Sequence, residues 1–186
     1  MKVENAFEVP DRRAAVWALL MDVPRVVPCV PGATLTASQS EDRWRAELAV
    51  TLGPVAMSFD ADITRESADE AAGLVALAVR ALEQKGRGAA TATARSHVED
   101  AGGATRVTVS TDLRLQGAVA RVGRQEIVEE VSQQITDAFA RCLQAMLTAR
   151  SDDDPPAAGA RAPAAFRISV RAILAGLWRR LTRRER

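Results

Sequence analysis

Apolar and polar residues alternate through most of residues 33–116, and this pattern predicts β-strands. Within residues 44–50 every second position is apolar, with Arg45 and Glu47 between them. The alternation resumes after Gly53-Pro54, and further strands are predicted near 73–83, 87–98 and 104–116. Since no helical pattern separates these strands, the predicted sheet is an antiparallel meander.

Residues 2–9 alternate weakly and predict a first strand. Asp11 follows as the expected N-cap of a short helix, and three prolines within residues 22–31 then permit only a short helix and a turn. Over residues 118–149 apolar side chains recur at spacings of three and four. This spacing predicts a helix of about 45 Å, long enough to cross the sheet, and Gly117 is expected to let the last strand turn into it.

The last part of the chain has a different composition. Residues 150–163 form a segment rich in proline, alanine and acidic residues, which predicts a linker between a folded domain at 1–149 and a helix at 164–186. On a helical wheel the apolar residues of 164–186 fall within an arc of about 140°, with arginines opposite or near its edges. The residues expected to bind a membrane are Phe166, Val170, Arg171, Ile173, Leu174, Leu177, Trp178, Arg179, Arg180, Leu181, Arg183 and Arg184.

The formal net charge of +1 divides unevenly along the 186 residues. Residues 1–154 hold 17 basic and 23 acidic residues, whereas residues 155–186 hold eight arginines and a single acid, Glu185. A basic amphipathic helix with a tryptophan is typical of a segment that lies in the membrane interface. Docking on a partner or on the acidic body is the alternative, and nucleic acid is disfavoured because an apolar arc has no role on phosphates.

No run of about 18 apolar residues is present, so no spanning helix is expected. The first residues also lack the apolar core of a secretory signal. The predicted location is therefore the cytoplasm, with peripheral attachment to the inner face of the cell membrane. In that compartment the two cysteines, Cys29 and Cys142, are expected to be reduced thiols.

Three short motifs occur in order along the body. They are Val16-Trp17 with Leu20 and Asp22, followed by Cys29-Val30-Pro31-Gly32; then Gly53-Pro54-Val55 with Phe59; and then residues 115–123 with Phe139. Over about residues 1–148 the chain resembles the carbon monoxide dehydrogenase G-subunit family, within the START-like (polyketide cyclase-like) helix-grip superfamily. The alanine-rich strand near 87–98 departs from the expected pattern.

The resemblance implies an α+β helix-grip fold, in which a curved antiparallel sheet of six to seven strands wraps around a long C-terminal helix. It also implies an apolar cavity between sheet and helix. The implied role is that of an accessory to a molybdenum-containing carbon monoxide dehydrogenase or related hydroxylase, which it attaches to the membrane and so to the respiratory quinone pool. The resemblance implies no catalytic residue.

Small side chains on the strands indicate whether the space between sheet and helix is empty or filled. Ala90, Ala92 and Ala94 share one strand parity, as do Ala76 and Ala78, and alanines facing the helix leave space. The alternative is a solid core filled by Trp17, Met57, Phe59 and Phe139. Together with the resemblance, the alanines favour an apolar cavity suited to an isoprenoid or acyl chain. Its expected lining is Trp17, Leu20, Cys29, Val30, Met57, Phe59, Ala92, Val119, Val122, Ile127, Val131, Ile135 and Phe139.

Catalytic and metal-binding residues are not expected. His97 is the single histidine and no CxxC motif occurs, so a His/Cys zinc site is excluded. A Ser-His-acid interpretation of residues 96–100 fails because neighbours in a strand point to opposite faces, which makes His97 a surface residue. Glu126, Glu129 and Glu130 are interpreted as a charged helical face rather than a polar mouth, and Cys29 as a packing residue.

The expected function is a non-enzymatic carrier and tether. It has no covalent cofactor, binds menaquinone or a similar isoprenoid quinone, and has the molybdenum dehydrogenase, the hydrophobic ligand and anionic lipids as partners. Three alternatives stay open: a membrane tether without ligand, an assembly factor for the molybdenum enzyme, and a cyclase or hydratase on the same fold. An enzyme of that kind needs a pair of titratable residues inside the cavity.

Overall fold

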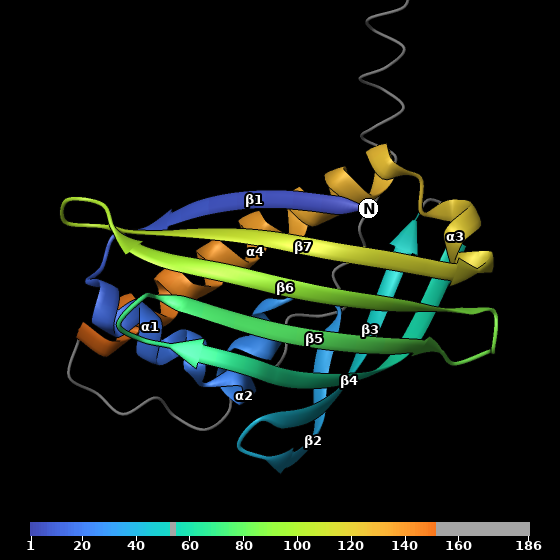
Figure 1. Ribbon diagram of the computed structural model, residues 1–186, viewed down its shortest axis with the longest axis horizontal. Coiled ribbons are helices and arrows are strands. Elements are labelled where there is room, and N and C mark those ends of the chain that lie inside the picture. The colour runs from blue at the N-terminus through green and yellow to red at the C-terminus, as the bar shows by residue number, and fades with distance from the viewer. Residues whose placement is uncertain (53–54, 152–186) are drawn as a thin grey trace, which may run out of the picture.

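The computed structural model describes residues 1–52 and 55–151 (Figure 1). In this part of the chain a seven-stranded antiparallel sheet has the order β1-β7-β6-β5-β4-β3-β2, so β1 and β2 form its edges. The predicted meander over residues 33–116 and the predicted first strand are confirmed. The strands are β1 (Lys2–Val9), β2 (Ala33–Ser40), β3 (Arg43–Leu52), β4 (Val55–Asp69), β5 (Leu74–Glu83), β6 (Gly88–Asp100) and β7 (Thr105–Gly117).

Between β1 and β2 the chain forms α1 (Arg13–Met21), α2 (Val23–Val26) and the short 3-10 helix η1 (Val27–Cys29). The prediction of Asp11 as the N-cap of α1 is wrong, because Arg12 occupies that position and no side chain caps the helix. The carboxylate of Asp11 instead accepts a hydrogen bond from the backbone N–H of Arg12 at 2.6 Å. The backbone carbonyl of Asp11 accepts one from the Thr105 hydroxyl at 2.7 Å. Asp11 thus ties the start of α1 to β7.

The helix predicted over residues 118–149 is interrupted. It consists of α3 (Ala118–Val122) and α4 (Gln125–Ser151), separated by Gly123 and Arg124. Gly123 leaves the helical conformation with ψ of 58°, and a Cβ on it would lie 2.1 Å from Cδ1 of Leu115. The glycine therefore lets α3 pack closely on the end of β7 without displacing the Leu115 side chain. Gly117 has φ of 68° and turns the chain from β7 into α3, as predicted.

Helix α4 lies across one face of the sheet, with α1 and α2 near one end (Figure 1). No helix within residues 1–52 and 55–151 is long and apolar enough to cross a membrane. The predicted linker begins at residue 150 and α4 extends to Ser151. Residues 152–186, which include the predicted tail helix and all its membrane-binding residues, lie outside the described residues.

The apolar core beneath α4 changes character along the helix. Towards its C-terminal end Leu143 is fully buried and packs with Val9, Val16 and Trp17 in one cluster. Towards its N-terminal end Ile127 is 38% exposed. The helix therefore rests on a solid core at one end and on a looser region at the other.

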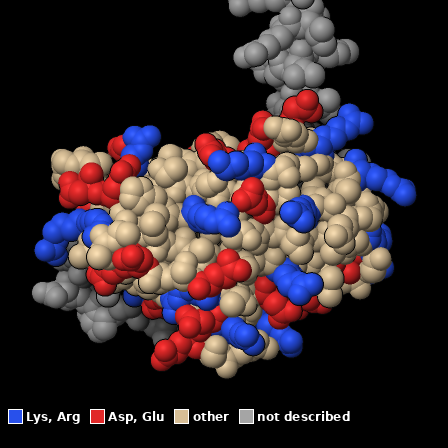
Figure 2. Space-filling view, viewed as in Figure 1, with Lys and Arg blue, Asp and Glu red and all other residues tan. Residues whose placement is uncertain are grey.

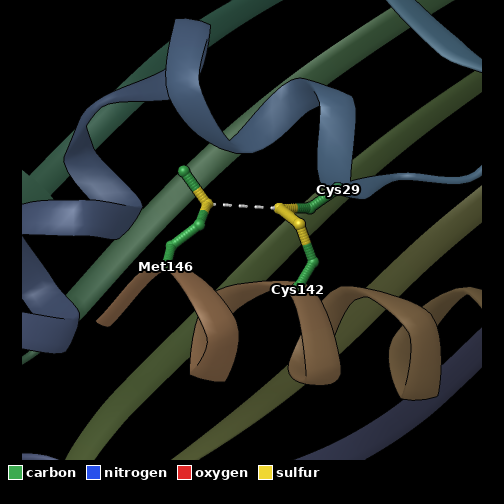
Figure 3. Close-up of a disulfide and its surroundings, with 3 residues drawn as sticks. All are labelled: Cys29, Cys142 and Met146. Carbon is green, nitrogen blue, oxygen red and sulfur yellow. Dashed lines mark hydrogen bonds between the residues drawn. A yellow bond between two sulfur atoms is a disulfide. The ribbon is translucent and has the colours of Figure 1, made fainter. Parts of the chain in front are cut away.

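Cys29 and Cys142 form a disulfide that joins the end of η1 to α4 (Figure 3). The expectation of reduced thiols is therefore wrong for this structure. The two Cα atoms lie 5.5 Å apart although 113 residues separate them in the sequence, so only the packing of η1 on α4 brings them together. Met146 Sδ lies 3.6 Å from Cys29 Sγ and covers the bond from the same helix.

We expect the disulfide to stabilise the body, because it closes a long loop and so reduces the conformational entropy of the unfolded chain. Replacing both cysteines, Cys29→Ser with Cys142→Ser, should lower the free energy of unfolding by about 2–4 kcal/mol, measured by urea denaturation. A dithiol reductant should lower the midpoint of the wild type and leave that of the double variant unchanged. Two free thiols per chain in the untreated protein would contradict the prediction.

Candidate functional site

A cavity of about 550 Å³ lies between the sheet and the N-terminal half of α4. Its floor is made by inward-facing residues of the strands, because successive side chains of a strand alternate between the two faces. Helix α4 approaches β1, α1 and η1 most closely and so leaves space over the middle strands. The volume lies within the usual range of about 300–1,000 Å³ for small-molecule sites.

Ten of the thirteen side chains predicted to line a cavity do line it. They come from α1 and the turn before β2, from β4, and from α3 and α4. The ten are Leu20, Val30, Met57, Phe59, Val119, Val122, Ile127, Val131, Ile135 and Phe139.

The other three predicted residues do not line the cavity. Trp17 is 5% exposed and belongs to the solid core beneath the C-terminal half of α4. Cys29 is taken up by the disulfide with Cys142. Ala92 has the inward parity, but it pairs with Val79 and Leu113, whose larger side chains form the wall at that level.

The alanines divide between the two faces of the sheet. Ala90 and Ala94 line the cavity, whereas Ala76 and Ala78 lie on the outer face, because Val75, Leu77 and Val79 take the inward positions of β5. The solid-core alternative is correct for Trp17 but wrong for Met57, Phe59 and Phe139. The ring of Phe139 packs edge-to-face on Phe7 at 6.0 Å.

Sequence reasoning missed much of the wall. The missed apolar residues come from every strand and from α2 and η1, with the largest shares on β5, β7 and β3. The alternation of these strands was recognised, but not which parity faces inward. It also missed every polar lining residue, since a serine or threonine on a strand gives no signal of the side it faces. The missed polar residues are Asn5, Ser96, Thr111, Ser132 and Thr136, together with Arg65.

Arg65 is the one ionisable residue among the described residues that line the cavity, and each of its three guanidinium nitrogens donates a hydrogen bond to the protein. Nε donates to Asp42 Oδ1 at 2.7 Å, and the terminal nitrogens donate to the carbonyls of Met21 at 3.1 Å and Glu41 at 2.9 Å. Its carbon Cζ also lies 5.4 Å from the ring centre of Trp44. Arg65 therefore ties β4 to α1 and to the β2–β3 turn and presents no free cation to a ligand.

Glu83 at the end of β5 also has inward parity and is only 4% exposed. Its carboxylate accepts the guanidinium of Arg87 at 2.6 and 3.0 Å, and the backbone N–H groups of Lys85 and Arg87 at 3.0 Å each. These hydrogen bonds, that from the Arg87 side chain above all, lower the pKa of Glu83 from 4.5 to about 2 against the opposing effect of burial. The charge is thus neutralised within the β5–β6 turn.

Residues considered for catalysis lie elsewhere. His97 is exposed, with Nδ1 3.9 Å from Glu99 Oε2, while the preceding Ser96 lines the cavity, so the two neighbours point to opposite faces as expected. Glu126, Glu129 and Glu130 are exposed on α4, as interpreted from the sequence. Within the described ranges, no group of three or more His, Cys, Asp or Glu residues has the arrangement to hold a metal ion.

A helix gripped by a curved seven-stranded sheet with a cavity between them places the body in the START-like class. The comparison with solved structures agrees. A conserved protein from Geobacillus kaustophilus has a TM-score of 0.70 at 21% identity, covering 80% of this chain and 96% of that one. The Zhui aromatase/cyclase from a Streptomyces species gives 0.55 at 17% identity over 86% and 98% of the two chains. A START superfamily protein from Mycobacterium smegmatis gives 0.53 at 14% over 80% and 98%.

Identities this low establish the fold alone, and a search of curated proteins found no match. The family is shown by the sequence itself. Residues 6–148 match the family described as the G subunit of carbon monoxide dehydrogenase (CoxG), so the chain belongs to this family. The resemblance inferred from the three motifs is confirmed.

The Glu83–Arg87 pair should make stability depend on pH in acid. Because the folded pKa of Glu83 is about 2 and the ordinary value is 4.5, the pair's contribution is fully present above about pH 4.5 and is lost as the pH falls towards 2. Urea midpoints of the wild type and Glu83→Gln should therefore differ most above pH 4.5 and converge towards pH 2. Glu47→Gln, which removes an exposed carboxylate, serves as the control and should follow the wild type throughout. A constant difference between the wild type and Glu83→Gln would contradict the assignment.

Proposed function

We propose that this chain is a non-enzymatic accessory protein of a molybdenum-containing carbon monoxide dehydrogenase, which binds a hydrophobic lipid such as menaquinone and recruits the dehydrogenase to the membrane. Membership of the CoxG family supports the association with the dehydrogenase. The observation that carries the ligand is the apolar cavity of about 550 Å³ between α4 and the sheet. An apolar site of this volume favours a ligand with an apolar body over a polar metabolite.

The cavity also favours a carrier over an enzyme. Acid–base chemistry needs a titratable group within hydrogen-bond reach of the reacting atoms, and usually a second one that shifts its pKa. Arg65 is the only ionisable residue among the described lining residues, its guanidinium stays protonated, and each of its nitrogens already donates to a protein oxygen. In the proposed function the dehydrogenase reduces a quinone presented by the cavity, so electrons reach the respiratory chain without the enzyme itself entering the bilayer.

Membrane attachment is assigned to the basic segment 164–186. The outer face of the sheet carries acidic and basic side chains interspersed with neutral ones rather than a basic surface (Figure 2). The body as a whole is acidic, with 23 acidic against 17 basic residues in 1–154. An anionic leaflet repels such a body, whereas each arginine of the segment contributes on the order of 1 kcal/mol near the lipid surface.

Filling the cavity should abolish ligand binding. Ala94→Leu adds apolar volume inside the cavity, whereas Ala78→Leu adds the same volume on the outer face and serves as the matched control. We expect delipidated wild type and Ala78→Leu to bind menaquinone with the same saturable affinity, measured by titration, and Ala94→Leu to bind at least about tenfold more weakly.

Two results would contradict the carrier. One is wild-type protein that binds no menaquinone and yields no lipid on extraction and mass spectrometry. The other is an Ala94→Leu variant that couples the dehydrogenase to quinone reduction as well as wild type does, which favours a tether without ligand.

A different result would favour the assembly factor: a dehydrogenase that lacks its molybdenum cofactor when it is made without this chain.

The basic segment should bind anionic vesicles through both insertion and charge. Leu177→Glu and Arg179→Glu should each weaken sedimentation of the full chain with vesicles containing phosphatidylglycerol, and added salt should weaken binding of the wild type. Arg80→Glu, the same charge reversal at an exposed position of β5, should leave binding unchanged. If Arg80→Glu and Arg179→Glu weakened vesicle binding equally, the net charge of the chain alone would determine binding. That result would contradict the assignment of membrane binding to residues 164–186.

A further inference from the structure

Polar side chains gather at one level of the otherwise apolar cavity. Asn5 on β1 and Ser96 on β6 both face Val109 of the strand between them, and Thr111 is the next inward residue of that strand. Diagonal neighbours of this kind lie about 7–8 Å apart in a sheet. Helix α4 closes the group from above, because the Ser132 hydroxyl donates to Asn5 Oδ1 at 2.6 Å and Thr136 lies one turn further on.

These groups differ in whether their hydrogen bonds are already made. Asn5 is held by Ser132 and donates from Nδ2 to Gln133 Oε1 at 3.1 Å. Within the described residues the hydroxyls of Ser96, Thr111 and Thr136 have no hydrogen-bond partner. Every fully buried side-chain nitrogen or oxygen of the described residues does have a partner. The three residues line the cavity, and their hydroxyls are therefore not fully enclosed by protein. A ligand oxygen placed among them can accept or donate hydrogen bonds that an apolar wall cannot offer.

No free charge accompanies the hydroxyls. Arg65 is the only ionisable residue of the described lining; its charge is paired with Asp42, and its other two nitrogens donate to backbone carbonyls. Glu83 is neutralised by Arg87. A carboxylate or phosphate moved into this site loses its hydration without gaining a counter-ion, which is strongly unfavourable. A neutral carbonyl or hydroxyl loses far less, and hydrogen bonds to the three hydroxyls offset that loss.

We propose that Ser96, Thr111 and Thr136 form a head-group subsite that selects neutral, oxygen-bearing amphiphiles, such as isoprenoid quinones and alcohols, over anionic lipids of the same chain length. The subsite adjoins Val98 and Val107 of the solid core. The other direction along the cavity is apolar, through Leu113, Leu115 and Val119 towards the partly exposed Ile127. The head of the ligand therefore lies against the core and its tail extends towards α3. This inference rests on the proposed function, since it assigns the ligand class of the same cavity.

The test compares two probes that differ only in the head, farnesol and farnesoic acid, at pH 8, where the acid is ionised. Titration of the delipidated full chain should show at least about tenfold tighter binding of the alcohol. The double variant Thr111→Val with Thr136→Val keeps the side-chain shape and removes two hydroxyls. It should bind farnesol and menaquinone about 10- to 30-fold more weakly, the loss expected for two hydrogen bonds.

Controls separate the subsite from folding and from the proposed function. Thr93→Val makes the same change on the outer face of β6 and should bind both probes as wild type does, while Thr111→Ser should retain the preference for the alcohol. Equal affinity for the two probes, or wild-type affinity in the double variant, would overturn the subsite and leave a hydrophobic carrier without head selection. Failure of the wild type to bind farnesol and menaquinone alike would overturn the proposed function itself, and the subsite with it.

Discussion

Helix α4 has to bury one apolar face against a curved sheet, and the packing is complete along only half of its length. At the C-terminal half, Leu143 and Leu147 pack on Val9, Val16 and Trp17, and a disulfide to η1 fixes the helix in place. Because that half is anchored, the N-terminal half is held above the middle strands without having to touch them. An apolar void costs stability, since its walls lose dispersion contacts, and the solid core and the disulfide offset that cost.

The same apolar void explains why the charged side chains that point towards it are paired with other protein groups. Unpaired charge beside an apolar space is unfavourable, and both ionisable groups with inward parity on β4 and β5, Arg65 and Glu83, are satisfied by protein partners. Among the described lining residues, the side-chain groups still able to hydrogen-bond a ligand are chiefly neutral hydroxyls. An interior of this kind suits a lipid that must be held and released unchanged. It is poorly suited to proton transfer, which distinguishes the proposed carrier from an enzyme on a related fold.

Membership of the CoxG family and the cavity address different parts of the function. The family indicates with which enzyme the chain works, and the geometry indicates what kind of molecule fits inside it. The proposed link between them is a quinone, because it is both a neutral apolar ligand and an electron acceptor. The basic segment 164–186 completes the proposal by supplying the attraction to lipid that the acidic body lacks.

The amino-acid sequence by itself determined the order of the elements, the meander and the family. These follow from local patterns: period-two alternation, spacings of three and four, and glycines such as Gly32 and Gly117 at the ends of elements. It also identified ten lining residues, mostly on helices and β4, where the apolar face is unambiguous. The tertiary structure alone decided the parity of the alanines on β5 and β6, the exclusion of Trp17, the hydroxyl cluster and the Cys29–Cys142 pair. Each of these depends on strand register or on contacts between distant segments, and local spacing carries no information about either.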